Sequence, residues 1–200
     1  YNYEPNDGAE VLYIEGANNG DALVNPGSFP YINLNLDPMG FLLRKGQHVV
    51  LLTAHRRENA RDGGFQALGQ AVAKLAQRHP TVQWLFALHY NPAVREVILP
   101  LLGDIDNVWL VAPPAYPEFV QLLRRVTLIV SDSGGLQEEG LALGIPTLIT
   151  RTNTERMEGV LAGGAQLVGN RGADVEAAVD KLLQDKAAYE KMAAAPSPYG

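Results

Sequence analysis

The sequence contains no cysteine, which excludes disulfide bonds, cysteine-ligated zinc and thiol catalysis. Its longest apolar runs, such as 49–52 and 128–130, are far shorter than the ~20 residues that span a bilayer. The first residues show no signal-peptide pattern either, so we expect a cytoplasmic protein without a membrane partner. The net charge of −6 argues against a protein whose main partner is nucleic acid, although a local arginine cluster could still bind a phosphate.

From residue 47 onward, short apolar runs alternate regularly with longer amphipathic stretches. The apolar runs are almost continuous, as in strands buried on both faces of a parallel sheet. They are 48–53, 82–89, 107–112, 127–131, 146–150 and 165–168. The helical stretches between and after them are 65–78, 92–102, 117–125, 135–143, 174–183 and 187–195. This alternation predicts an α/β fold with a right-handed, doubly wound parallel sheet.

The first 46 residues follow a different pattern. Residues 11–14 read as a strand, and 16–19 as the turn after it. Residues 22–46 contain three prolines and several glycines and asparagines, which predicts mostly loop with short helical pieces. We therefore expect an irregular segment over 1–46 and one domain over 47–200.

The strongest local motif is Ser133-Gly134-Gly135, which follows the apolar run 128–130 and precedes Glu138 and Glu139. Glycines at the start of a helix let an anion approach the backbone N–H groups and the positive end of the helix dipole. A glutamate one turn later can accept the hydroxyls of a ribose. The alternative is a tight turn whose two carboxylates merely face solvent. The P-loop lysine and the G-x-G-x-x-G pattern are both missing, which weakens an ATPase or a simple dehydrogenase.

Three other polar segments follow predicted strands. His55 and Arg56 come after the first strand of the alternating region, and His89 comes after the second. A fourth segment, 151–158, contains Arg156 and begins a helix for which Thr154 is the expected N-cap. Because the carboxyl ends of parallel strands lie at one edge of a sheet, these segments are expected to share a ligand site there. Each alone could also be a solvated loop with ion pairs of little energetic value.

These segments together resemble one enzyme family. The matching stretches are 55–59, 89–96, 132–139, 154–156 and 198–200, in this order. The chain is similar to the carboxyl-terminal half of the non-hydrolysing UDP-N-acetylglucosamine 2-epimerases, most clearly from Val49 to Gly200. Met157 stands where the family usually has proline, and Ala54 where it usually has glycine.

The resemblance implies one Rossmann-like domain of a two-domain GT-B architecture, with the active site between the domains. It implies interconversion of UDP-GlcNAc and UDP-ManNAc by elimination and re-addition of UDP, with no cofactor and no metal. UDP and UDP-GlcNAc would be the ligands, and a homodimer the expected assembly. The acidic acid/base residues of the family belong to the other domain, so these 200 residues are expected to bind UDP with little or no turnover.

The resemblance also assigns roles to single residues. His55 matches the catalytic histidine near the diphosphate, and Arg56 and His89 match an activating second UDP-GlcNAc site. The expected UDP-binding residues are Ser133, Gly134, Gly135, Glu139, Phe119 and Arg156.

Three other functions remain open at this point. A UDP-sugar glycosyltransferase of the same two-domain fold would also hold its donor in this half, but it would not need the His-Arg-Arg-Glu-Asn run at 55–59. A hydrolysing epimerase, which releases ManNAc and UDP, would share every motif described above. A non-enzymatic UDP-sugar-binding or regulatory module would bind UDP without turnover.

Overall fold

Six strands form one parallel sheet in the computed structural model, which describes residues 9–12, 41–44, 47–56 and 63–200. Their order across the sheet is β5-β4-β3-β6-β7-β8. The strands are β3 (Val49–Thr53), β4 (Gln83–Ala87), β5 (Val108–Val111), β6 (Leu128–Ser131), β7 (Thr147–Ile149) and β8 (Ala165–Leu167). All neighbours pair in parallel, so the predicted doubly wound α/β sheet is confirmed.

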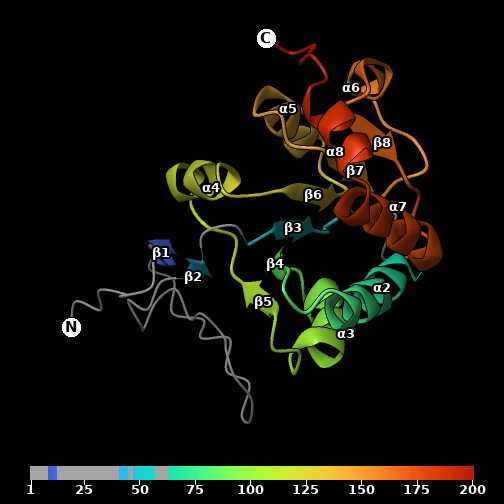
Figure 1. Cartoon of the computed structure of the whole chain (residues 1–200). Helices are drawn as coiled ribbons and strands as arrows, with labels where there is room; N and C mark the ends of the chain where they lie inside the picture. Colours follow the sequence, from blue (N-terminus) through green and yellow to red (C-terminus); the bar gives the residue numbers. More distant parts are fainter. Residues whose placement is uncertain (1–8, 13–40, 45–46, 57–62) are drawn as a thin grey trace.

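Seven helices accompany these strands in the described part of the chain (Figure 1). They are α2 (Gly64–Arg78), α3 (Pro92–Leu102), α4 (Tyr116–Leu123), α5 (Gly134–Ala142), α6 (Met157–Ala162), α7 (Gly172–Gln184) and α8 (Lys186–Ala193). The predicted start of α3 is confirmed, because the Asn91 side chain accepts a hydrogen bond from the N–H of Ala93 and Pro92 is the first helical residue. At the end of α5, Gly144 has φ 68°, a left-handed conformation that glycine adopts without strain.

In the amino-terminal segment, one expectation was wrong and one predicted strand is shifted. Strand β2 (Phe41–Arg44) lies where the sequence predicted loop, and it pairs antiparallel with β1 (Ala9–Leu12). The prolines that suggested loop all precede Phe41, so they do not interrupt the apolar end of that segment. β1 begins two residues before the predicted strand 11–14, and the expected turn at 16–19 lies outside the described residues.

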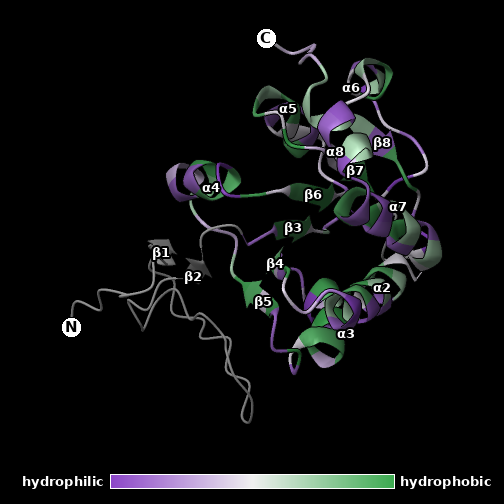
Figure 2. Cartoon of the chain, viewed as in Figure 1, coloured by the Kyte–Doolittle hydropathy of each residue, from purple (hydrophilic) through white to green (hydrophobic). Residues whose placement is uncertain are grey.

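The sheet is buried on both faces. Val50 and Leu52 of β3 pack with α2, α3 and α7, whereas Val49 and Leu51 pack with α4 and α5 on the other face. Successive side chains of a strand point to opposite faces, so one continuous apolar run supplies both cores. Figure 2 shows the resulting hydrophobic strands with hydrophilic residues on the surrounding helices.

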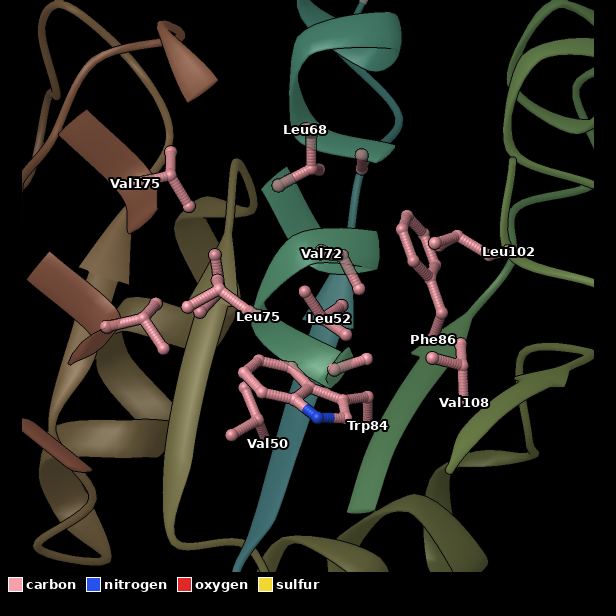
Figure 3. Packing of buried hydrophobic residues seen from close by; sticks show 14 of the residues in the cluster. Val50, Leu52, Leu68, Val72, Leu75, Trp84, Phe86, Leu102, Val108 and Val175 are labelled. Atoms are coloured by element: carbon pink, nitrogen blue, oxygen red, sulfur yellow. The ribbon is translucent and has the colours of Figure 1, made fainter. Parts of the chain in front are cut away.

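The larger core lies between the sheet and helices α2, α3 and α7 (Figure 3). Trp84 and Phe86 of β4 are its largest fully buried side chains, and Leu75 of α2 and Leu102 of α3 pack beside them. Close packing of this kind holds β3 and β4 rigidly. The polar segments that follow these two strands are therefore anchored at their start.

The strand order fixes where a ligand site can form. The chain runs outward from β3 to β4 and β5, then returns to place β6 on the other side of β3. The sheet therefore has a topological switch point between β3 and β6, and ligands of open α/β sheets bind beyond the carboxyl ends of the strands at such a point. The loops of His55 and Ser133 both leave the sheet there.

Candidate functional site

A cavity of about 350 Å³ opens at this switch point. Six of the residues predicted for the site line it: His55, His89, Phe119, Ser133, Gly135 and Glu139. Thr53, Ala54, Ala87, Pro113, Pro114, Tyr116 and Leu136 complete the lining. The segments after β3, β4 and β6 thus come together as predicted, and the loop after β5 joins them, whereas no residue of the predicted segment 151–158 lines the cavity.

Asp132 joins the two central loops. Its carboxylate is fully buried and accepts the backbone N–H of His55 at 3.0 Å and that of Arg56 at 2.9 Å. Nδ1 of His55 lies 3.0 Å from the same carboxylate. Burial alone would raise the pKa of Asp132, but the His55 side chain and the two backbone N–H groups hold it below its usual value. Asp132 is therefore an anion, and it fixes the conformation of the His55 loop.

This contact also orients the imidazole of His55. A carboxylate accepts hydrogen bonds, so Nδ1 must carry a proton toward Asp132, which leaves Nε2 to meet a ligand. The His55 ring stacks on the His89 ring, with centroids 5.7 Å apart and planes 25° apart. The segments after β3 and β4 are therefore in contact through these two rings, and both rings line the cavity.

The two glycines of the central motif differ in what surrounds them. Helix α5 begins at Gly134, one residue before its predicted start, so both glycines belong to its first turn. A side chain at Gly134 would come within 2.8 Å of the guanidinium carbon of Arg156. No atom of the described residues lies within 4 Å of where a side chain at Gly135 would begin. The missing side chain at Gly134 thus leaves room for the guanidinium of Arg156, and the missing side chain at Gly135 leaves open space in the cavity.

Arg156 lies beside the cavity rather than in its wall. Its guanidinium pairs with Glu138 and with Glu155, the latter at 2.9 Å. Glu155 also pairs with Arg151 at 2.9 Å and with Arg56 at 3.4 Å. A hydrogen bond from its own backbone N–H, followed by the one from Arg151, lowers the pKa of Glu155 to about 2. Three arginines are therefore gathered around one carboxylate close to the first turn of α5.

The loop of Arg156 has a different local structure from the one predicted. Helix α6 begins at Met157 with Arg156 as its N-cap, so Thr154 is not the cap. The Thr154 hydroxyl instead accepts the N–H of Arg156 at 3.1 Å and donates to the Gln137 side chain at 2.8 Å. Gln137 in turn donates to the backbone oxygen of Ser133 at 3.3 Å. A buried polar chain therefore connects the Ser133 turn to the Arg156 loop.

Comparison with known proteins decides the family. The sequence profile described as UDP-N-acetylglucosamine 2-epimerase matches residues 22–200. The chain belongs to this family. The epimerase of Yersinia pestis is 41% identical over 171 residues, which are 86% of this chain and 45% of that protein. The epimerase of Neisseria meningitidis is 41% identical over 158 residues, covering 79% of this chain and 42% of that protein. The chain thus spans less than half the length of these relatives.

Solved structures of family members have the same fold. The Neisseria meningitidis epimerase bound to UDP-GlcNAc superposes with a TM-score of 0.77 over 79% of this chain and 42% of that chain. The Methanocaldococcus jannaschii epimerase in complex with UDP-GlcNAc and UDP is 27% identical, with a TM-score of 0.66, and the match covers 77% of this chain and 42% of that one. A glycosyltransferase of Rickettsia africae shares only the fold, at 14% identity and a TM-score of 0.56 over 74% of this chain and 41% of that one.

Two features are absent from the described residues. These residues contain no group of three or more histidines and acidic side chains placed to hold a metal ion. Within the same ranges, no helix combines the length and hydropathy needed to cross a bilayer.

Sequence reasoning missed Asp132 and Gln137 as site residues. Both stand in the motif of residues 132–139, but their importance comes from contacts with segments 77 and 17 residues away. The strand order alone could have indicated Asp132, since the residues that follow two neighbouring parallel strands are close in space.

Proposed function

We propose that the cavity at the switch point binds UDP as part of a UDP-N-acetylglucosamine 2-epimerase. The observation that supports this most is the convergence of His55, Ser133, Gly135, Glu139 and Phe119 on one cavity in a member of this family. The volume of about 350 Å³ lies within the range of small-molecule sites. The Neisseria relative was solved bound to UDP-GlcNAc.

Each part of UDP has a complementary part of the cavity. The uracil would lie against Phe119 and the neighbouring Pro113 and Tyr116, which form its apolar side. Glu139 would accept the ribose hydroxyls, one helical turn beyond Gly135. The diphosphate would then reach the first N–H groups of α5 and the Ser133 hydroxyl, where the helix dipole favours an anion. Arg156 would come to the diphosphate from beside Gly134.

The proposed reaction begins with elimination across C1–C2 of UDP-GlcNAc. The C1–O bond breaks, the C2 proton passes to a base, and UDP leaves with the electron pair of the broken bond. Re-addition of UDP after protonation of C2 on the other face gives UDP-ManNAc. In its doubly protonated form, with the Nδ1 proton directed at Asp132, His55 would donate from Nε2 to hold or protonate the leaving diphosphate. The base at C2 would come from the part of the protein outside these 200 residues.

Further parts of the proposal rest on family resemblance. Arg56 and His89 would contact a second, activating UDP-GlcNAc, which the position of His89 beside His55 would bring close to the first. We further propose a cytoplasmic homodimer whose product enters polysaccharide biosynthesis. The segment His55-Arg56-Arg57-Glu58-Asn59 favours an epimerase over a glycosyltransferase of similar fold. A hydrolysing epimerase would use the same UDP cavity.

Calorimetric titration with UDP tests the binding proposal. The parent chain should bind UDP, and Ser133→Ala and Glu139→Ala should each weaken binding about tenfold, since each removes one or two hydrogen bonds to the ligand. Tyr189→Phe is a suitable control, because Tyr189 lines a second, separate cavity together with Lys186 and Glu190. No binding of UDP by the parent chain would overturn the proposal.

A further inference from the structure

Helix α6 begins without a capping side chain of its own. Its N-cap residue is Arg156, and an arginine side chain has no acceptor for the unpaired N–H groups of the first turn. An N-cap side chain normally accepts the N–H of the second or third helical residue. Here the third helical residue is Gly159, so its N–H must find an acceptor elsewhere in the protein.

The hydroxyl of Tyr199 supplies this acceptor from 40 residues away. It accepts the N–H of Gly159 at 3.2 Å and donates to the backbone oxygen of Arg156 at 3.3 Å. One hydroxyl thus binds both the N-cap residue and the first turn of α6. It performs the task of a capping side chain from a different segment of the chain.

The packing around Tyr199 is adapted to this contact. Its ring packs against the small core formed by Leu141, Ile149 and Ala165. A side chain at Gly159 would begin only 3.1 Å from the Tyr199 hydroxyl, so the glycine is what allows the close approach. Burial raises the pKa of Tyr199, so the phenol keeps the proton that it donates to Arg156.

Arg156 is consequently held at both polar atoms of its backbone. The Thr154 hydroxyl accepts its N–H, and the Tyr199 hydroxyl binds its carbonyl oxygen. Its guanidinium then covers Gly134 at the start of α5. A side chain with this many rotatable bonds binds an anion well only if its starting point is fixed, because the ordering otherwise costs binding energy.

We infer that Tyr199 is a positioning residue that fixes Arg156 for contact with the diphosphate. This inference rests on the proposed function, since it takes the bound anion to be the diphosphate of UDP. It adds the carboxyl-terminal segment to the site, although Tyr199 itself does not line the cavity.

Tyr199→Phe removes the hydroxyl and keeps the ring that packs on the core. Titration of the 200-residue chain should show UDP binding weakened about three- to tenfold, while binding of uridine, which has no phosphate, stays unchanged. Tyr189→Phe is the matched control, because that hydroxyl also donates to a backbone oxygen, that of Thr127 at 3.1 Å, away from the site. It should leave the affinities for both ligands unchanged.

A double-mutant cycle separates positioning from a general loss of structure. In an Arg156→Ala background, Tyr199→Phe should cost no further UDP affinity, because the side chain that it positions is gone. Amide exchange at Gly159 should accelerate in Tyr199→Phe without any ligand. Equal losses for UDP and uridine, or an undiminished loss in the Arg156→Ala background, would overturn the positioning role while UDP binding stands. A parent chain that binds no UDP would overturn both proposals.

Discussion

At the scale of single residues, Asp132 determines the arrangement of the site. It is fully buried, it accepts hydrogen bonds from the backbone N–H groups of His55 and Arg56, and it pairs with the His55 side chain. A buried carboxylate is stable only when donors surround it, and here the donors belong to the loop that it positions. The site and the stability of this loop therefore depend on the same carboxylate.

Asp132→Asn should destabilise the chain by about 2–4 kcal/mol, because the amide turns a donor toward at least one of the N–H groups that the carboxylate satisfies. Urea unfolding at neutral pH measures this loss. The variant should also bind UDP more weakly than its folded fraction explains, since His55 loses its orienting partner. A change below about 0.5 kcal/mol, within the range of ordinary surface substitutions, would contradict this account.

Acid should act on the same residue. The folded pKa of Asp132 is depressed below 3.8, so its stabilising contribution is complete above that pH and is lost as the pH falls through the folded value. Glu155 also stabilises the folded state above pH 4.5, and this stabilisation is lost as the pH falls toward its folded pKa of about 2. Its side chain is half exposed, so it contributes less to the free energy of unfolding. Between about pH 5 and 2, the free energy of unfolding should decrease less steeply with falling pH for Asp132→Asn than for the parent chain. Parallel curves would contradict the assigned role.

At the scale of elements, helix α5 has one glycine that allows close packing on the sheet and another that faces the cavity. Gly140 lies inside the helix, and a side chain there would begin 2.9 Å from Ile129 of β6. Gly135 has open space in front of it and lines the cavity. The helix can thus approach the sheet at one glycine and a ligand at the other.

These two glycines give a matched pair of substitutions. Gly140→Ala should lower the free energy of unfolding by about 1–3 kcal/mol through overpacking. Gly135→Ala should leave it unchanged or raise it by up to about 1 kcal/mol, because alanine favours the helix. It should nevertheless weaken UDP binding, since the methyl group enters the cavity. Thermal unfolding and UDP titration of both variants measure this, and a stable Gly135→Ala that binds UDP normally would contradict the assigned place of the ligand.

The sequence was sufficient to predict the elements of the sheet but not every element around it. Strands such as β3 and β6 are continuous apolar runs with a strong pattern, so their positions were predicted almost correctly. For the six-residue helix α6, the sequence predicted a start capped by Thr154, whereas the Tyr199 hydroxyl of a distant segment binds its first turn. No local pattern can reveal such a cap. The same holds for β2, whose strand structure depends on pairing with β1.

For the site, the sequence predicted which segments meet but not the contacts among them. The expected cavity residues after β3, β4 and β6 do share one cavity. The polar chain from Ser133 through Gln137 to Thr154 and the Asp132 contacts arise only after folding. The roles assigned to His55, Arg56, His89 and the UDP-binding residues stay predictions until ligands are measured.

At the scale of the whole molecule, the chain spans 42–45% of the length of the relatives compared above. In the proposed function, it would supply a histidine and backbone N–H groups to the leaving diphosphate. The described part has no carboxylate besides Glu139 in the cavity wall, and Glu139 is assigned to the ribose. We therefore predict that this chain binds UDP but does not epimerise UDP-GlcNAc.

Incubation of the 200-residue chain with UDP-GlcNAc in heavy water should give no deuterium at C2, although UDP binds. The physical reason is that, among the described residues, the cavity wall has no carboxylate beyond Glu139 that could remove the C2 proton. The same reaction with a full-length relative, such as the Neisseria meningitidis epimerase, should incorporate deuterium, as an epimerase requires. Mass spectrometry measures the deuterium content. Deuterium at C2 after incubation with the 200-residue chain alone would contradict the prediction.

The location of the bound nucleotide is the most direct test of the account. Amide spectra of the isotope-labelled chain should show UDP-dependent shifts at Ser133, Gly134 and Gly135, at the first turn of α5. Residues around the second cavity, such as Lys186 and Tyr189, should stay unchanged. Shifts concentrated at that second cavity, or no shifts at saturating UDP, would contradict a UDP site at the switch point of the sheet.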